Sequence, residues 1–441
     1  KTGIKTRRSL KDASFMKLLN KIYAVLASKE KKVVAQNFLS LVMLQGANYV
    51  LPLLILPYLV RVLGAEKFGL VMFAQSFAVF LTVFVDFGFN ISGTREISLA
   101  RNDKAKTGEI FLSIMIIKLG LIIISFSILY VIVNTFTRFS IDAEVYLLSF
   151  GVVIGQALFP VWFFQGIEKM KFVSFINILA KVIFTILVFI LIKSESDYFK
   201  VPIYNSLGFI VSGLIGFALS FQYLEFRLPK TSLIKQLLVD SSSLFVSNFA
   251  SSMYTASNVF ILGLFSGNVI AGVYSSMEKL TLAVKNVYVP FYQALYPWVA
   301  RQEDIQKKQI INKIMPPVFF VSTVITLVIL LFAKSILEIV YDDVLITSYA
   351  NVFRILSFVS IFSGLNMLYN MLYFPAIKRY KVRMNILIFG GLFNMTMNLI
   401  LVQFYDIYGI AIIVSITELL LVFIGYYYFK KLSNQISISN I

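Results

Sequence analysis

Residues 44–95 read LQGANYVLPLLILPYLVRVLGAEKFGLVMFAQSFAVFLTVFVDFGFNISGTR. This stretch contains most of two apolar runs, residues 38–60 and 68–89. About 20 residues rising 1.5 Å each cross the ~30 Å hydrocarbon core of a bilayer as one helix. The polar residues inside the runs are few and recur at helical spacing: Gln45, Asn48, Gln75, Thr82 and Asp86. The pattern therefore predicts two membrane-spanning helices, and the rest of the chain repeats it.

The composition excludes a water-soluble protein. Of the 441 residues, 59% are hydrophobic and 14% are charged, and the mean hydropathy is +0.83. An ordinary soluble domain is about 45–50% apolar and about 25% charged. The chain has no cysteine and no histidine, which excludes thiolate and imidazole metal ligands and a Ser-His-Asp triad. Because no phosphate-binding loop is found either, we expect no metal site, no cofactor and no enzymatic activity.

The hydropathy pattern predicts an all-α polytopic membrane protein with twelve transmembrane helices in two sets of six. The predicted spans are residues 38–60, 68–90, 110–133, 145–164, 173–192, 201–223, 244–265, 271–298, 316–340, 350–375, 385–404 and 408–429. The polar break at 224–243, which contains Pro229, divides them into two sets of six. The predicted organisation is a basic arm (1–35), an N-lobe (36–223), a linker (224–243), a C-lobe (244–429) and a tail (430–441).

Lysine and arginine residues are distributed unevenly between the two sides of these spans. The segments on the side of the N-terminus hold 29 of them and the opposite loops hold six. Basic residues are retained in the cytoplasm, so the imbalance predicts that both termini, the arm, the linker and the tail are cytoplasmic. The net charge of +18 then serves topology and contact with anionic lipid rather than nucleic-acid binding.

The two halves match at an offset of 203 residues. Residues 64–69, GAEKFG, then align with residues 267–272, GNVIAG. Two halves with the same number and direction of spans form a parallel repeat, and transporters built this way bind substrate between the repeats.

Several predicted spans carry stripes of polar side chains on one face. Lipid offers no hydrogen bonds, so such stripes face protein or water. We interpret them as the lining of a wet central cavity, with hydrogen bonding between helices as the alternative. The candidate binding residues are Gln45, Asn48, Asn248, Ser251, Thr255, Asn258, Tyr292, Asn366 and Asn370.

Charged residues inside the spans are the sharper signal, because each costs roughly 2.5–3.5 kcal/mol at the centre of a bilayer. The candidate substrate-binding cations are Lys285, Lys118, Lys181 and Arg354, and snorkelling to the interface is the alternative for the last three. Cations outnumber acids, which favours a phosphate-bearing ligand. A coupling proton or Na⁺ would use carboxylates: Glu278 and Glu418 are the first candidates, and a structural ion pair is equally plausible for Asp86. Pro52 and Pro57 are hinge candidates, with static kinks as the alternative.

Two stretches resemble the start of the Wzx-type O-antigen and capsule repeat-unit flippases: residues 46–77 and residues 86–101, which read DFGFNISGTREISLAR. These are polysaccharide transporters of the superfamily that includes the MATE exporters. The resemblance covers residues 31–106 and includes two cations of the family motif, Arg61 and Arg95, whose role could be packing or topology.

The resemblance implies a V-shaped pair of six-helix bundles with alternating access in a bacterial inner membrane. The implied cargo is an oligosaccharide on polyprenyl pyrophosphate, moved from the inner to the outer leaflet for O-antigen, capsule or exopolysaccharide assembly. Cations of the central cavity would meet the pyrophosphate. The implied partners are this lipid-linked glycan, the phospholipid bilayer and the polysaccharide polymerase machinery.

Two other functions are compatible with a polytopic membrane protein of this kind. A MATE-type cation or drug antiporter shares the architecture, but its cavity is expected to carry acids. An integral-membrane glycan polymerase or ligase usually has a sizeable outer loop with catalytic residues, whereas the outer loops here are only about ten residues long.

Overall fold

The computed structural model describes residues 29–439, although not the side chains of residues 29–45, 47–50, 247, 251, 254, 255, 294, 297 and 436–439. Most of the predicted basic arm therefore lies outside the described residues. The first half contains α2 (Lys29–Asp86), α3 (Phe89–Ala100), α4 (Lys104–Thr135), α5 (Thr137–Ser140), α6 (Ala143–Leu158), α7 (Val161–Gly166), α8 (Met170–Leu191), a 3₁₀ turn η1 (Glu195–Phe199) and α9 (Lys200–Ser220).

The second half is built in the same way. It contains α10 (Thr231–Phe265), α11 (Gly267–Asn286), α12 (Tyr288–Ala300), α13 (Asp304–Tyr341), α14 (Val344–Ser348), α15 (Ala350–Met367), a π-helical turn η2 (Leu368–Tyr373), α16 (Phe374–Ala376) and α17 (Tyr380–Ser439). No strand occurs between residues 29 and 439, which confirms the all-α prediction. The predicted linker is helical from Thr231 onward and continues into α10.

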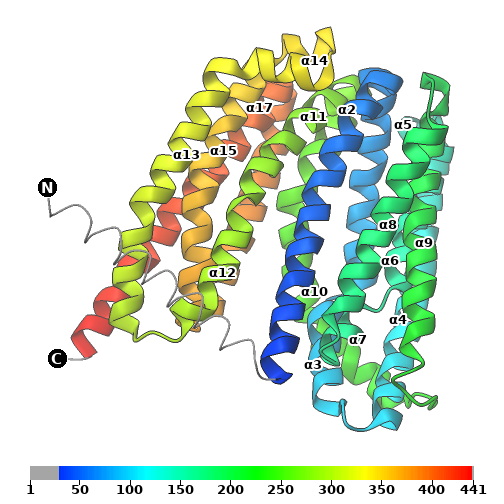
Figure 1. The fold of residues 1–441 in the computed structure, drawn as a ribbon. Helices are drawn as coiled ribbons and strands as arrows, with labels where there is room; N and C mark the ends of the chain where they lie inside the picture. The colour runs from blue at the N-terminus through cyan, green and yellow to red at the C-terminus, as the bar shows by residue number, and fades with distance from the viewer. Residues whose placement is uncertain (1–28, 440–441) are drawn as a thin grey trace, which may run out of the picture.

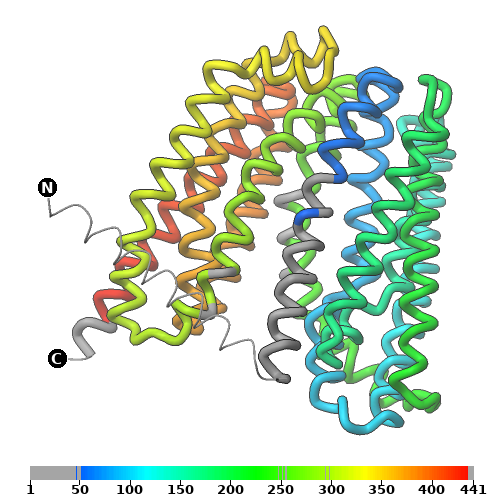
Figure 2. Tube along the Cα trace, in the orientation of Figure 1, coloured from blue at the N-terminus to red at the C-terminus, as the bar shows by residue number. Residues whose placement is uncertain are grey.

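Eight helical segments of the described chain are long and apolar enough to cross a membrane, so the protein is a multi-pass membrane protein. Two of them, residues 51–100 and 380–435, are 50 and 56 residues long. A straight helix of that length would measure about 75 Å or more, far beyond the bilayer core. Each contains one residue with non-helical dihedral angles, Gly64 or Asp406, where two helices join. Figure 2 shows the chain turning back there, in the blue and in the orange-red part of the trace.

The helices form two groups that come together at the end where α14 lies and diverge toward the other end (Figure 1). One hydrophobic cluster joins the groups: it combines Leu59 and Phe68 of α2 with Val273 of α11, Leu337 of α13 and Ile410 of α17. Helix α10 packs on both groups. Its Phe260 lies 5.4 Å from Phe73 of α2, between ring centroids, and its Asn258 accepts a hydrogen bond from Asn398 of α17.

The matched glycine motifs occupy equivalent places at the end where the groups meet. Gly64 and Gly267 both have positive φ angles, 69° and 85°, which glycine adopts without steric cost. Each begins a helix that starts at this end. Gly69 and Gly272, five residues further on, face each other: a Cβ on Gly69 would overlap the carbonyl oxygen of Asn268, and a Cβ on Gly272 would overlap that of Ala65. The two backbones therefore cross in direct contact.

Two arginines of the first half bind backbone carbonyls of the second half at the same end. Arg61 donates from Nε to the carbonyl of Tyr341 (3.2 Å) and from Nη2 to those of Ile339 (3.1 Å) and Val340 (3.0 Å), the last residues of α13. Arg138 donates from Nε and Nη2 to the carbonyl of Gly263 near the end of α10 (3.1 and 2.7 Å). A guanidinium satisfies carbonyls that lack a helical partner and opposes the negative end of the helix dipole. These contacts therefore close this end of the molecule.

Replacing Gly69 with Ala is expected to lower the free energy of unfolding by about 1–3 kcal/mol, because a methyl group would force the crossing backbones apart. Thermal unfolding in detergent measures the effect. Gly120→Ala is the matched control, since Gly120 lies in the middle of α4 with no atom near its missing Cβ. Equal midpoints for the two variants would contradict the close crossing.

Candidate functional site

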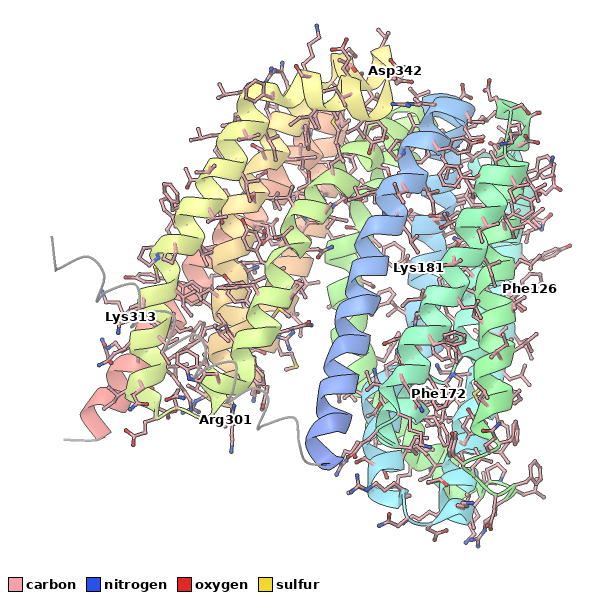
Figure 3. All side chains as sticks on the ribbon, viewed as in Figure 1. Phe126, Phe172, Lys181, Arg301, Lys313 and Asp342 are labelled. Carbon is pink, nitrogen blue, oxygen red and sulfur yellow. The ribbon has the colours of Figure 1, made fainter. Side chains whose placement is uncertain are left out.

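A cavity of about 350 Å³ lies between the two halves, next to the glycine crossing. Its walls come from α2, α8 and α9 of the first half and from α11 of the second. The lining is mostly aliphatic, and the polar lining residues are Gln75, Lys181, Asn205, Lys279 and Asn286. Figure 3 labels Lys181 between the two ends of the molecule, away from Asp342 at one end and Arg301 at the other. The cavity is therefore at membrane depth.

The lining of this cavity carries two positive charges and no carboxylate. Lys181 comes from α8 of the first half and Lys279 from α11 of the second. The structure records no ion pair for Lys279 among the described residues. Lys181 is a predicted site residue. The sequence reasoning did not select Lys279, although it recurs on one face of α11 with Leu282, Ala283 and Asn286, the spacing of a cavity-lining stripe.

Lys285 lies in the last turn of α11, and its charge is balanced by a carboxylate. Its Nζ donates to Oε1 of Glu418 in α17, and Glu418 is fully buried. The other carboxylate oxygen accepts a hydrogen bond from Nδ2 of Asn366 (3.0 Å), and Oδ1 of Asn366 accepts one from Nδ2 of Asn370 (2.6 Å). Four predicted site residues thus form one network. Asn370 lies in the π-helical turn, a feature frequent at functional sites.

A second polar network of the C-terminal half contains Glu278. Its carboxylate accepts a hydrogen bond from Nδ2 of Asn258 (3.2 Å), whose Oδ1 accepts one from Asn398 (2.8 Å). Asn398 also donates to Asn394 (3.0 Å). A cavity of about 40 Å³ is lined by residues of both networks, including Glu278, Lys285 and Glu418. The sequence reasoning did not select Asn394 or Asn398, although they are four residues apart on one face of a predicted span.

The N-terminal half contains another charged pair. Nζ of Lys118 in α4 lies 3.2 Å from Oδ1 of Asp86 at the end of α2, with the lysine buried and the aspartate 17% exposed. Asp86 therefore forms an ion pair, as one of its two interpretations predicted. The pair borders a cavity of about 90 Å³, which is also lined by Thr82, Asn90, Gln156, Asn177, Phe159 and Phe209.

Other predicted site residues lie away from these cavities. Arg354 donates to the carbonyl of Leu330 in α13 (3.0 Å) and to Asn351 (2.6 Å), and buried Tyr292 donates to the carbonyl of Gly364 (2.6 Å). Arg95 is largely exposed, 3.7 Å from Glu96.

The remaining predicted site residues lie on α2 and α10. Asn248 is half-buried, and the side chains of Gln45, Asn48, Ser251 and Thr255 lie outside the described residues. Pro52 lines the central cavity, and α2 keeps helical dihedral angles through Pro52 and Pro57.

Comparison with known proteins gives concordant results. Residues 34–303 match a family model described as polysaccharide biosynthesis protein. A protein of Escherichia coli K12 whose name assigns it O-antigen transport is 28% identical over 87% of this chain and 94% of its own. A Shigella dysenteriae protein with the same name is 31% identical over 62% of this chain and 68% of its own. The resemblance to Wzx-type flippases is thereby confirmed, and these relatives are named as transporters and not as enzymes.

The fold has relatives among solved structures. An inward-facing multidrug resistance MATE transporter of the MOP superfamily superimposes with a TM-score of 0.68 at 14% identity, covering 89% of this chain and 96% of that one. The MATE-like fold predicted from the sequence is therefore confirmed.

Lys285→Met is expected to lower the free energy of unfolding by about 3 kcal/mol, because it leaves the buried Glu418 carboxylate without its cation. Lys279→Met serves as the control, and thermal midpoints in detergent give the comparison. The double variant Lys285→Met/Glu418→Leu should recover most of the loss. If Lys285→Met and the control have the same thermal midpoint, the Lys285–Glu418 pair does not stabilise the fold.

Proposed function

The chain belongs to the family of polysaccharide biosynthesis proteins, and we propose that it moves polyprenyl-pyrophosphate-linked oligosaccharide repeat units from the inner to the outer leaflet of a bacterial inner membrane. The names of the relatives support a transporter of O-antigen precursors. The observation that carries the proposal is the central cavity, whose mostly aliphatic lining includes two lysines and no carboxylate. An amphiphile with a polyanionic headgroup fits this chemistry.

The proposed topology has twelve transmembrane helices, six in each half, and both termini in the cytoplasm. The turns at Gly64 and Asp406 support it, because each divides a long segment into two antiparallel helices. The distribution of charge supports the orientation: Arg301, from one of the predicted cytoplasmic clusters, lies at the end opposite Asp342 (Figure 3). The end toward which the two groups of helices diverge then faces the cytoplasm.

In the proposed mechanism the headgroup enters between the halves from the inner leaflet while the prenyl chain stays in lipid. Lys181 and Lys279 hold the pyrophosphate, one from each half, so the bound ligand bridges the two. Rocking of the halves would open the end closed by Arg61 and Arg138 and expose the headgroup outside. The acids Glu278 and Glu418 are the candidates for coupling to a proton or Na⁺, and the polymerase machinery would receive the product.

The cavity argues against a cation or drug antiporter. Such a substrate needs acids or a neutral aromatic lining, whereas the two charges that line this cavity are positive. The names of the relatives do not support a glycan polymerase or ligase, because both relatives are named as transporters.

Lys181→Met and Lys279→Met are each expected to slow translocation about tenfold or more, because a charge-assisted hydrogen bond to phosphate contributes about 1.5–3 kcal/mol. The assay is the accessibility of a polyprenyl-pyrophosphate oligosaccharide headgroup in proteoliposomes. Lys334→Met, at an exposed position of α13, is the matched control. If the wild type moves no such lipid but exchanges an organic cation for protons, the protein is an antiporter instead.

The membrane potential should change the extent of net outward transport. Moving negative charge outward is favoured by about 2.3 kcal/mol per charge for each 100 mV of inside-negative potential. An imposed potassium diffusion potential should therefore increase outward accumulation severalfold, and the opposite potential should reduce it. Outward accumulation that is the same at both potentials would contradict the outward movement of uncompensated negative charge.

A further inference from the structure

We propose that the smaller cavity of the N-terminal half is a sugar subsite. In this proposal, which rests on the proposed function, the cavity of about 90 Å³ beside Asp86 and Lys118 receives the sugar attached to the pyrophosphate. It is large enough for one edge of a sugar ring and too small for an oligosaccharide. In this proposal it therefore binds the first sugar, while the rest of the repeat unit lies between the halves.

The subsite is next to the proposed pyrophosphate site. Phe209 of α9 lines both cavities, so they share a wall. Asn177 of the smaller cavity and Lys181 of the central one are four residues apart in α8, which places them on the same face about 6 Å apart along the axis. The same order occurs along α2, where Gln75 lines the central cavity and Thr82 and Asp86 line the smaller one. A headgroup that binds Lys181 through its phosphate thus has its first sugar at Asn177.

The chemistry of the lining matches sugar hydroxyls, which both donate and accept hydrogen bonds. The amides of Asn90, Gln156 and Asn177 can do both, and the Asp86 carboxylate accepts. Phe159 and Phe209 supply an apolar surface for the C–H face of a ring. Lys118 balances the charge of Asp86, so this carboxylate does not repel the neighbouring pyrophosphate.

Polar groups of this cavity are exposed to a ligand, whereas the asparagines of the C-terminal networks are buried. The side chains of Asn90 and Gln156 are exposed, and neither has a recorded partner among the described residues. Asn177 uses its Nδ2 for the carbonyl of Val173 (2.9 Å). In the C-terminal networks, by comparison, Asn258, Asn366 and Asn398 bind other side chains. Asn90 and Gln156 therefore present accessible hydrogen-bonding groups to a ligand in the smaller cavity.

The test separates the sugar from the pyrophosphate. Binding of two probes to the full chain in lipid nanodiscs is compared: polyprenyl pyrophosphate alone, and the same lipid carrying one hexose. For the double variant Gln156→Ala/Asn177→Ala, the hexose-bearing lipid should bind about tenfold more weakly and the sugar-free lipid with unchanged affinity. The matched control is Asn134→Ala/Gln403→Ala, because Asn134 makes the same bond to the carbonyl four residues earlier and Gln403, like Gln156, is exposed.

The outcomes distinguish the two proposals. Selective loss of affinity for the hexose-bearing lipid supports the subsite. An equal loss for both lipids, or a wild type that binds both equally well, overturns the subsite and leaves the proposed function intact. If the wild type binds neither lipid, the proposed function fails first and the subsite fails with it. A control variant that loses the same affinity as the test variant would assign the effect to folding and overturn the subsite.

Discussion

The direct contact of two backbones at Gly69 and Gly272 sets the geometry of this molecule. Side chains normally keep helix axes about 8–10 Å apart, and only the missing Cβ atoms let these two helices touch. The halves are joined at this end by the shared hydrophobic cluster and by two arginines on helix-terminal carbonyls. From the crossing the helices diverge, and about two turns further along, Gln75 of α2 and Lys279 of α11 line the central cavity. The position of the cavity thus follows from the crossing.

The absence of hydrogen-bonding solvent in the bilayer explains how the charges are arranged around this cavity. An isolated charge at this depth is costly, so the structure neutralises Lys118 with Asp86 and Lys285 with Glu418. Both pairs lie beside the central cavity rather than in its lining. Lys181 and Lys279 line the central cavity itself, one from each half.

Much of the fold could be predicted from the sequence because membrane insertion and repeat symmetry leave local signals. Apolar runs of about 20 residues, the basic clusters and the matched glycines each describe a few neighbouring residues, and the helical segments and the turn at Gly64 follow from them. The site depends on contacts that no local pattern contains. The partner of Lys285 is 133 residues away, and the hydroxyl of Tyr292 binds the carbonyl of Gly364 on a neighbouring helix. A helical stripe shows which side chains share a face, but it does not show what that face meets.

The fold does not determine which substrate is transported, because that also depends on contacts of individual side chains. A multidrug transporter shares this architecture at 14% identity, so the arrangement of helices is compatible with unlike substrates. The difference must lie in a few lining residues, and here both lining charges are lysines. A lysine offers a compact charge on a flexible stem, whereas an arginine would grip a phosphate through two fixed hydrogen bonds. A transporter must release its ligand on the far side as readily as it binds it, and ligands held by adjustable single contacts from two moving halves meet that requirement. In the proposed mechanism, separation of the halves would move Lys181 and Lys279 apart and so weaken the bridging contact at the moment when release is needed.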